Sequence, residues 1–210
     1  MTRVPLSAIA QAARASAPLL GGERPMRLVL VDGPAGSGKT TLANRIVASL
    51  GGDPSPGPGT FDHPRAHARE KPAQVLHADD MYEGWDGLET LDAVLVDQVL
   101  RPLSAGRDAS FRMWDWEASA RTHEIPVPVR PYLVIEGVGV GREAARRLAG
   151  LLVWVEAPAD VRLRRGLERD GESMRDEWLR WQPREDAHFA ADGTRAAADV
   201  VVDGAVPLPD

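Results

Sequence analysis

The segment Val31–Thr41, VDGPAGSGKTT, constrains the fold of this chain more than any other part of the sequence. It overlaps the end of an apolar run, residues 26–33, which stops at a glycine and is typical of a buried parallel strand. Gly33–Thr40 fits the pattern G-x-x-x-x-G-K-[ST], and a helical segment, 39–50, begins at its lysine. This order of strand, glycine-rich turn and helix predicts a loop whose backbone N–H groups surround phosphate oxygens.

The loop is expected to hold a nucleoside triphosphate together with Mg²⁺. The N-terminus of the following helix adds a partial charge of about +0.5. Lys39 would reach the β- and γ-phosphates, and the Thr40 hydroxyl would bind Mg²⁺. Lys39 and Lys71 are the only lysines of the chain, and a compact ammonium group suits this position. We predict ATP and Mg²⁺ as cofactors, with GTP left open as the donor. The predicted nucleotide-binding residues are Gly33, Pro34, Ala35, Gly36, Ser37, Gly38, Lys39, Thr40 and Thr41.

Further apolar runs predict buried strands over residues 73–80, 132–137, 151–157 and 198–204. Helical segments fit around them, over residues 6–17, 88–103, 142–149, 159–169 and 174–191, and an extended aromatic segment over 110–118. Strands that alternate with helices imply right-handed crossovers and a parallel sheet. The sequence therefore predicts an α/β fold of the P-loop NTPase class, a three-layer sandwich in which a parallel five-stranded sheet carries helices on both faces.

The chain of 210 residues is long enough for one domain with a sizeable core. Within this single domain, 1–210, we expect an N-terminal helical extension at 1–25. The Gly/Pro-rich stretch 51–72 is expected to be a flexible surface excursion. An arginine-rich lid is expected at 160–190.

Composition excludes several classes of function. The chain has no cysteine, so disulfides, thiol catalysis and zinc–thiolate sites are excluded. The net charge of −6 argues against nucleic acid as the main partner, because phosphate backbones need a basic surface. No apolar run approaches the ~20 residues that span a bilayer, and the N-terminus does not resemble a signal peptide. We therefore expect a cytoplasmic protein without a membrane partner, and the oligomeric state stays open, a homo-oligomer included.

Two other users of such loops lack their expected residues here. A GTPase usually reads guanine with N-K-x-D, and the only asparagine is Asn44, inside the helix that follows the loop. An AAA-type ATPase expects a strand that ends in paired acids, whereas 132–137 supplies the single acid Glu136 before a glycine. A transferase is favoured over both.

Two adjacent carboxylates, Asp79 and Asp80, end the predicted strand 73–80. Ligands of open parallel sheets bind at the carboxyl ends of the strands. Phosphoryl transfer to an alcohol needs a carboxylate that orients the hydroxyl and accepts its proton. Because neighbouring side chains point in different directions, one carboxylate could serve the substrate while the other serves a water of Mg²⁺ or caps a helix.

The strand, the phosphate loop, ADDMY (78–82), MWDW (113–116), VIEG (134–137) and the arginine-rich helix together resemble the phosphoribulokinase/uridine kinase family over roughly residues 26–204. The resemblance implies that Asp79 is the general base and that Glu136 lies near Mg²⁺ and its waters. It also implies that arginines of the lid clamp the transferring phosphate, with Arg165 and Arg169 as the candidates. Asp80 is a further candidate at the metal.

The resemblance also implies which residues bind the acceptor. Tyr82 would contact a nucleoside, Trp85 would stack on it, and Asp86 would bind its sugar hydroxyls. Trp114 and Asp115 belong to a segment that closes over the acceptor in that family.

The implied activity is transfer of the γ-phosphate of ATP to a hydroxyl of a small molecule, first of all the 5′-hydroxyl of uridine or cytidine. Pyrimidine kinases carry a histidine that reads the base soon after the aromatic segment, and the nearest here is His123, some residues later. Nicotinamide riboside, pantothenate and an antibiotic hydroxyl therefore stay open as acceptors. A non-catalytic ATP-binding regulatory module is the more distant alternative, although a pure switch would need no base at Asp79.

Overall fold

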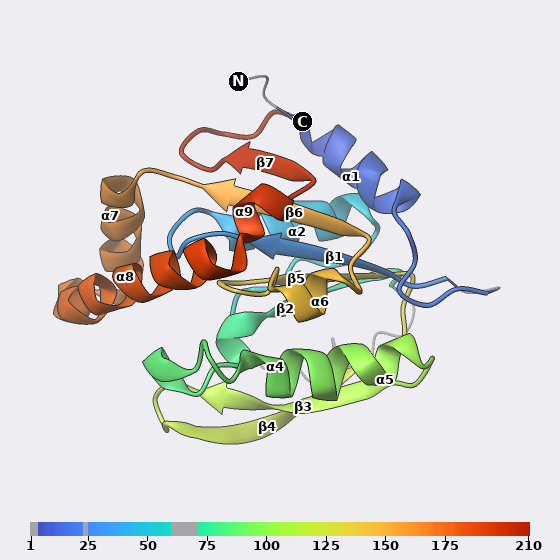
Figure 1. Cartoon of the computed structure of the whole chain (residues 1–210), viewed down its shortest axis with the longest axis horizontal. Coiled ribbons are helices and arrows are strands. Elements are labelled where there is room, and N and C mark those ends of the chain that lie inside the picture. Colours follow the sequence, from blue (N-terminus) through green and yellow to red (C-terminus); the bar gives the residue numbers. More distant parts are fainter. Residues whose placement is uncertain (1–3, 23–24, 60–70) are drawn as a thin grey trace.

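The computed structural model describes residues 4–22, 25–59 and 71–210, and its central feature is one parallel sheet (Figure 1). The five predicted strands all lie in this sheet, in the order β2-β5-β1-β6-β7. They are β1 Arg27–Asp32, β2 Ala73–His77, β5 Tyr132–Glu136, β6 Leu151–Glu156 and β7 Val200–Asp203. The α/β fold with a parallel five-stranded sheet is thereby confirmed.

Helices cover both faces of the sheet. On one face, α1 (Leu6–Ala15) and α2 (Lys39–Ser49) bury apolar side chains such as Ile9 and Ile46 against β1 and β6. On the other face, a second apolar cluster joins β1 and β5 to α4 (Leu91–Val94), α5 (Arg101–Ser104), α6 (Glu143–Arg146) and α8 (Arg175–Asp192). Because β1 is covered on both sides, its apolar run needs no polar alternation.

The predicted helix 88–103 differs from a regular helix in its middle turn. The chain passes from α4 through a π-helical turn, Leu95–Leu100, into α5. The Arg101 N–H reaches the carbonyl of Val96, five residues back. Pro102 follows directly and has no N–H, so the regular hydrogen-bond ladder cannot continue through this position.

The aromatic segment 110–118 is extended, as predicted, but it belongs to a hairpin that the sequence did not indicate. β3 (Ala109–Asp115) pairs with β4 (Ala120–Val127) in a separate antiparallel sheet, which lies beside α4 and α5 (Figure 1). Burial alternates along β3, whereas β4 is mostly exposed. β4 lacks the apolar alternation that identifies a strand, and it contains Pro126.

The segments at the two ends of the chain lie side by side (Figure 1). The Leu6 N–H donates to the carbonyl of Pro209 over 2.9 Å, and Ile9 and Ala13 of α1 enter the core beside α2. Of the predicted excursion 51–72, residues 60–70 lie outside the described residues. Residues 51–59 follow α2, where Ser55 exchanges hydrogen bonds of 2.9 and 2.8 Å with Asn44. No helix in the described ranges is long and apolar enough to cross a membrane.

The arginine-rich region consists of α7 (Ala159–Asp170) and α8, which cross closely at Gly166. A Cβ on Gly166 would lie 2.2 Å from the Trp178 ring, which is almost completely buried. The short helix α9 (Thr194–Ala197) then leads into β7. The absence of a side chain at residue 166 therefore sets how closely the two helices approach.

We predict that Gly166→Ala lowers the free energy of unfolding by about 1–3 kcal/mol, because the methyl group overpacks the Trp178 contact. Helix propensity alone would favour alanine by ~1 kcal/mol, so the sign of the effect separates the two causes. Urea unfolding measures it, with Arg164→Ala on the exposed face of α7 as the control. A Gly166→Ala variant as stable as the parent would contradict the close packing.

Candidate active site

The phosphate loop, Gly33–Thr40, joins β1 to α2 in a conformation that only glycine adopts readily. Gly36 has φ +76°, and a Cβ there would lie 2.5 Å from the backbone oxygen of Arg162. The Ser37 N–H donates to the Pro34 carbonyl over 3.2 Å and closes a tight turn. The loop is therefore shaped by its own backbone and by the start of α7.

Several polar groups of the loop are free to bind an anion. The N–H groups of Gly36 and Gly38 have no hydrogen-bond partner among the described residues, nor does the buried hydroxyl of Ser37. Lys39 is buried and donates from Nζ to the Pro34 carbonyl over 2.9 Å. Thr41 is exposed in the first turn of α2. Unpaired N–H groups at the N-terminus of a helix are suited to phosphate oxygens.

Asp32, the last residue of β1, is a buried carboxylate that the sequence analysis did not single out. It accepts backbone N–H groups from Gly33 (2.6 Å), Gly139 (2.9 Å) and Gly141 (2.7 Å). Burial raises its pKa to about 6, against the opposing effect of these N–H groups and of Lys39. Asp32 thus ties the start of the phosphate loop to the segment that follows β5. The sequence did carry a signal for Asp32, because it is an acidic residue at the end of an apolar strand and directly before a glycine.

Glu136 and Thr40 meet beside the phosphate loop, because β5 and β1 are neighbours in the sheet. The Thr40 hydroxyl donates to Glu136 Oε1 over 3.0 Å. His77, the last residue of β2, lies 2.6 Å from the same oxygen through Nδ1 and 2.8 Å from the Ser55 hydroxyl through Nε2. Burial acts to raise the pKa of Glu136, but the hydrogen bond and charge of His77 lower it. Burial acts to lower the pKa of His77, and Glu136 raises it.

The Thr40–Glu136 pair fits Mg²⁺. Both groups present oxygen, the ligand that Mg²⁺ prefers, and Mg²⁺ usually keeps several waters and nucleotide phosphates in its shell. The described residues contain no group of three or more His, Cys, Asp or Glu side chains able to hold a metal, so this pair would need the nucleotide to complete the site.

Asp79 and Asp80 lie in a short 3₁₀ turn, Ala78–Asp80, at the end of β2, and their environments differ. Burial and the charge of Glu136 raise the pKa of Asp79, while Arg169 and Lys39 lower it. Asp80 is buried and accepts the Gly59 N–H over 2.7 Å. Burial raises the pKa of Asp80 to about 6. Asp79 therefore faces the charges of the phosphate side, and Asp80 holds the segment after α2.

Three indole rings lie around the segment that follows Asp79. Trp116 Nε1 donates to the Asp79 carbonyl over 2.8 Å, and the Trp116 side chain is partly exposed. The Trp85 ring packs edge-on against Trp116, with centroids 5.6 Å apart, and against Trp181 of α8, at 5.8 Å. The hairpin is fastened to the same segment, because Arg121 Nη2 donates to the Met81 carbonyl over 3.0 Å. Trp116 belongs to the predicted aromatic segment, and it is the residue of that segment that contacts Asp79.

The other predicted acceptor residues are spread over different environments. Tyr82 is buried, and its hydroxyl donates to the Val138 carbonyl. Asp86 is exposed and pairs with Arg184 of α8. Trp114 lies beside Gly84, and Asp115 accepts the N–H groups of the turn residues 117 and 118. Trp85 is thus half-buried against the core, Asp86 is exposed, and Tyr82 lies in the core close enough to Asp79 for the Asp79 charge to help raise its pKa.

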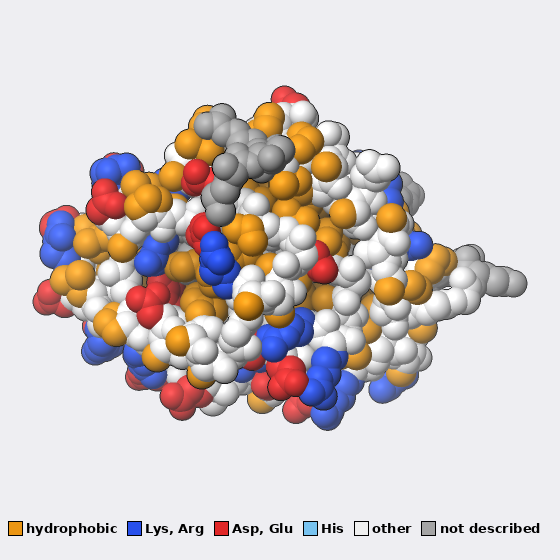
Figure 2. Space-filling model, turned by 45° about the horizontal axis from the view of Figure 1, so that its top comes forward, with side chains coloured by type: hydrophobic (Ala, Val, Ile, Leu, Met, Phe, Trp, Pro, Cys, Tyr) orange, Lys and Arg blue, Asp and Glu red, His pale blue; other side chains and the backbone are white. Residues whose placement is uncertain are grey.

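The two predicted lid arginines approach the site differently. Arg165 Nη1 donates to the Gly204 carbonyl over 2.9 Å and lies 3.5 Å from the Gly36 carbonyl of the phosphate loop. Arg169 pairs with Asp170 and is mostly exposed, although its charge acts on Asp79. Charged side chains of both signs intersperse over the surface formed by α7 and α8 (Figure 2). Several other arginines there pair within their own helix or turn, with the pairs Arg164–Glu168, Arg175–Glu172 and Arg180–Glu177.

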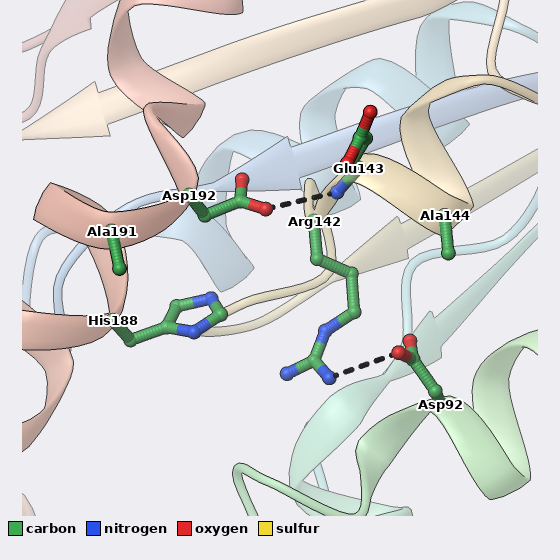
Figure 3. A pocket seen from close by; sticks show the side chains of 7 residues that line it. All are labelled: Asp92, Arg142, Glu143, Ala144, His188, Ala191 and Asp192. Carbon is green, nitrogen blue, oxygen red and sulfur yellow. Dashed lines mark hydrogen bonds and ion pairs between the residues drawn. The ribbon is translucent and has the colours of Figure 1, made fainter.

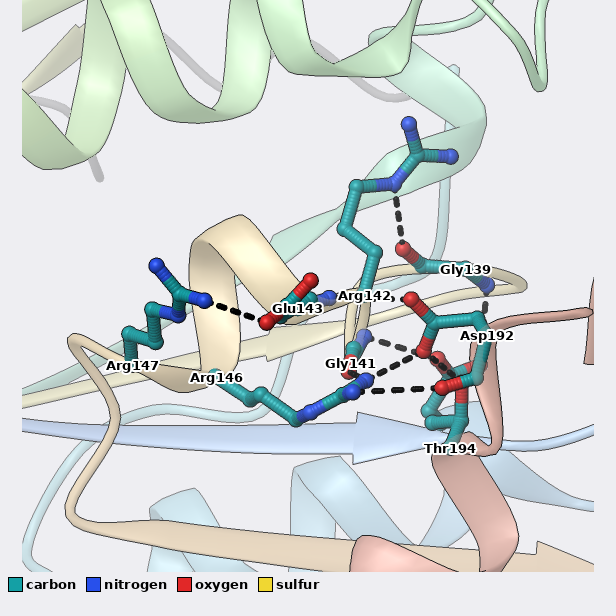
Figure 4. A network of polar contacts seen from close by, with 9 residues as sticks. Gly139, Gly141, Arg142, Glu143, Arg146, Arg147, Asp192 and Thr194 are labelled. Carbon is teal, nitrogen blue, oxygen red and sulfur yellow. Dashed lines mark hydrogen bonds and ion pairs between the residues drawn. The ribbon is translucent and has the colours of Figure 1, made fainter.

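A pocket of about 390 Å³ lies outside this constellation, between α4, α6 and the end of α8 (Figure 3). Its lining includes Arg142, which lies 3.5 Å from Asp92, and His188. None of the predicted site residues lines it. In its lining, Asp192 accepts the Glu143 N–H over 3.0 Å and pairs with Arg146, and the Thr194 hydroxyl donates to Asp192 over 2.6 Å (Figure 4). This network fixes the end of α8 to α6 and to the segment after β5.

Comparisons with known proteins agree with the fold. The model of the phosphoribulokinase/uridine kinase family matches residues 28–176. A possible uridine kinase from Bacillus stearothermophilus has a similar structure, with a TM-score of 0.61, 20% identity and coverage of 94% of this chain and 97% of that one. A candidate fructose transport system kinase from Silicibacter sp. TM1040 gives a TM-score of 0.59 and 18% identity over 94% of this chain and 98% of that one. Among curated proteins, none matches the sequence.

The buried carboxylate of Asp32 makes a testable contribution to the pH dependence of stability. Its folded pKa of about 6 exceeds the ordinary 3.8, so the folded state binds the proton more tightly than the unfolded state. The contribution is present below pH 3.8 and is lost as the pH rises through 6. Relative to Asp32→Asn, the free energy of unfolding of the parent should fall by about 3 kcal/mol across this window.

Urea unfolding of both proteins at several pH values measures this difference, and all other titrating groups cancel because both proteins share them. A difference that does not change with pH would contradict the assignment.

Proposed function

This chain belongs to the phosphoribulokinase/uridine kinase family of P-loop kinases, and on that premise we propose that it transfers the γ-phosphate of ATP to a hydroxyl of a small molecule, first of all the 5′-hydroxyl of a nucleoside. The observation that carries the proposal is the position of Asp79. Its carboxylate lies within electrostatic reach of Glu136, Lys39 and Arg169, at the carboxyl ends of neighbouring strands. A base, a metal-supporting carboxylate and two cations are the groups that this reaction needs.

On the donor side, the N–H groups of the phosphate loop and Lys39 would hold the β- and γ-phosphates. Thr40 and Glu136 would hold Mg²⁺, which would supply positive charge to offset the charge that develops on the phosphates. Arg169, whose side chain is mostly exposed, can turn from Asp170 toward the transferring group. Arg165 would act from the loop side, where it already lies against Gly36. Electrostatic stabilisation of this kind is the largest part of catalysis in phosphoryl transfer.

On the acceptor side, Asp79 would orient the hydroxyl and take its proton as the acceptor oxygen bonds to the γ-phosphorus. The bond between that phosphorus and the β,γ-bridging oxygen breaks, and ADP leaves with the bridging oxygen. No hydrogen bond from a described residue reaches the Asp79 carboxylate, which leaves it free for the substrate. A raised pKa suits a general base because it makes the carboxylate a better proton acceptor.

The indole rings around Asp79 support an acceptor with a flat apolar face. The Trp116 indole N–H donates to the Asp79 carbonyl, and the Trp85 ring packs against the Trp116 ring. Stacking on an indole suits a nucleobase and depends little on its identity. Asp86, beside Trp85, would bind ribose hydroxyls in place of its present partner Arg184.

The function is tested by ADP release from ATP and Mg²⁺ over a panel of acceptors: uridine, cytidine, nicotinamide riboside, pantothenate, an aminoglycoside and simple sugars. Strong stimulation by a pyrimidine nucleoside is expected. Stimulation only by another acceptor would keep the kinase chemistry and replace the nucleoside. ATP binding without transfer to any acceptor would favour a regulatory module that binds ATP.

We predict that Asp79→Asn lowers kcat by about a hundredfold or more, because the amide cannot accept the hydroxyl proton. The Kd for ATP should change little, since Asp79 does not touch the phosphate loop. Steady-state kinetics and calorimetric ATP binding measure the two effects, and Asp97→Asn, on an exposed helical face, is the matched control. Turnover retained in Asp79→Asn would exclude Asp79 as the base.

A further inference from the structure

Glu185 of α8 is a fully buried carboxylate that the mechanism above does not use. Its Oε2 accepts the backbone N–H of Ala35 over 2.8 Å and the Trp181 indole N–H over 2.9 Å. Its Oε1 accepts from Arg162 Nη1 over 2.6 Å. A carboxylate without solvent is retained only when its oxygens are paired, and here both are. One of the three donors belongs to the phosphate loop, 150 residues away along the chain.

The two charged partners hold the Ala35 residue from both sides. Glu185 accepts its N–H, and Arg162 of α7, also buried, lies 3.4 Å from its carbonyl oxygen. Ala35 is the second residue of the turn that the Ser37 N–H closes onto Pro34. Fixing both polar groups of this one residue fixes the turn, and with it the direction of the N–H groups that follow.

The anchors of Glu185 are themselves rigid. Arg162 Nε donates to the Ala157 carbonyl over 3.2 Å, at the end of β6. The end of α8 is fastened through Asp192 to Glu143 and Arg146 of α6, and Arg146 donates in turn to the Gly141 carbonyl in the segment after β5 (Figure 4). The contact therefore connects the loop to two elements that are each tied to the sheet, and α8 is not free to move away without breaking it.

The charge balance of the contact also suits a site for phosphates. A bare carboxylate near the triphosphate would repel it, but Arg162 neutralises Glu185 at 2.6 Å. Burial raises the pKa of Glu185, and the Ala35 N–H, Lys39 and Arg162 lower it. The pair can thus hold the loop without adding net charge beside the bound anion.

We propose that Glu185 is a positioning residue for ATP: it binds the Ala35 N–H and so presets the phosphate loop, which makes nucleotide affinity depend on a side chain of α8. The inference rests on the proposed function in taking this loop as the ATP site. Preorganised N–H groups bind an anion more tightly because no ordering is needed on binding. If Glu185 had a purely structural role and only joined α7 to α8, its substitution would leave ATP affinity unchanged in a folded protein.

Two double variants separate these roles. Arg162→Met with Glu185→Gln removes both charges but keeps an oxygen that accepts the Ala35 N–H. Arg162→Met with Glu185→Leu removes the charges and the oxygen while keeping similar volume. Both contain the same change at residue 162, so their comparison isolates the oxygen that accepts from Ala35 and, within the helix α8, from Trp181. Glu177→Gln, which affects an exposed ion pair on the same helix, is the control.

The measurement is the Kd for ATP with Mg²⁺ by calorimetry, well below the unfolding temperature of each variant. We expect the Glu185→Leu double variant to bind ATP about tenfold more weakly than the Glu185→Gln double variant, the effect of one lost hydrogen bond. At saturating ATP the turnover of the Glu185→Leu double variant should match that of the Glu185→Gln double variant. Its KM for ATP should therefore rise while its kcat changes little. If the Leu variant does not fold, Glu185→Asp, which keeps the charge but shortens the reach, should weaken ATP binding similarly.

Equal ATP affinity in the two double variants, or in Glu185→Asp and the parent, would overturn the positioning role and leave Glu185 as a contact between helices. This result differs from a failure of the proposed function, in which the parent protein itself would not bind ATP.

Discussion

A loop binds phosphate only if its backbone N–H groups stay unpaired, and the rest of this structure holds the loop in that state. Two buried carboxylates take the first N–H groups of the loop: Asp32 binds that of Gly33, and Glu185 binds that of Ala35. Gly36 follows with a positive φ, and its N–H has no partner among the described residues. In a helix or a sheet such a group would be saturated. The loop is thus fastened at its start and left open where an anion would bind.

The acidic side chains of the site differ in whether a partner offsets their buried charge. Glu136 is paired with His77, and Glu185 with Arg162, so each buried charge is offset within hydrogen-bond distance. Asp79 has no such partner, and only the more distant charges of Arg169 and Lys39 act to lower its raised pKa. A carboxylate left with open oxygens and increased proton affinity is suited to accept a proton, whereas the paired ones are suited to hold structure. The division of roles follows from the surroundings, since the residue types are alike.

Local patterns predicted most of the fold, and the proposed donor side lies within one such pattern. The strands are continuous apolar runs, and Gly33–Thr40 carries the phosphate loop within one segment. The buried contacts of Asp32 and Glu185 could not be predicted, because each joins residues far apart in the sequence. The β3–β4 hairpin was missed because β4 is mostly exposed and has no apolar alternation. Tyr82, implied as an acceptor contact by resemblance, is buried, and its hydroxyl donates to the Val138 carbonyl.

The proposed acceptor side differs from the proposed donor side in how it is assembled. Trp85 and Asp86 come from the turn after β2, Trp116 from the hairpin and Arg184 from α8, so no single segment fixes its shape. The Asp86–Arg184 pair is exposed, and exposed ion pairs are weak because water screens them. A polyhydroxyl acceptor can therefore replace Arg184 on Asp86 at little cost, and the released arginine would lie next to the bound molecule. In the proposed function, the shape of the acceptor site would then depend on the relative positions of three elements, whereas the phosphate loop lies within one segment, so a short motif points to the donor more directly than to the acceptor.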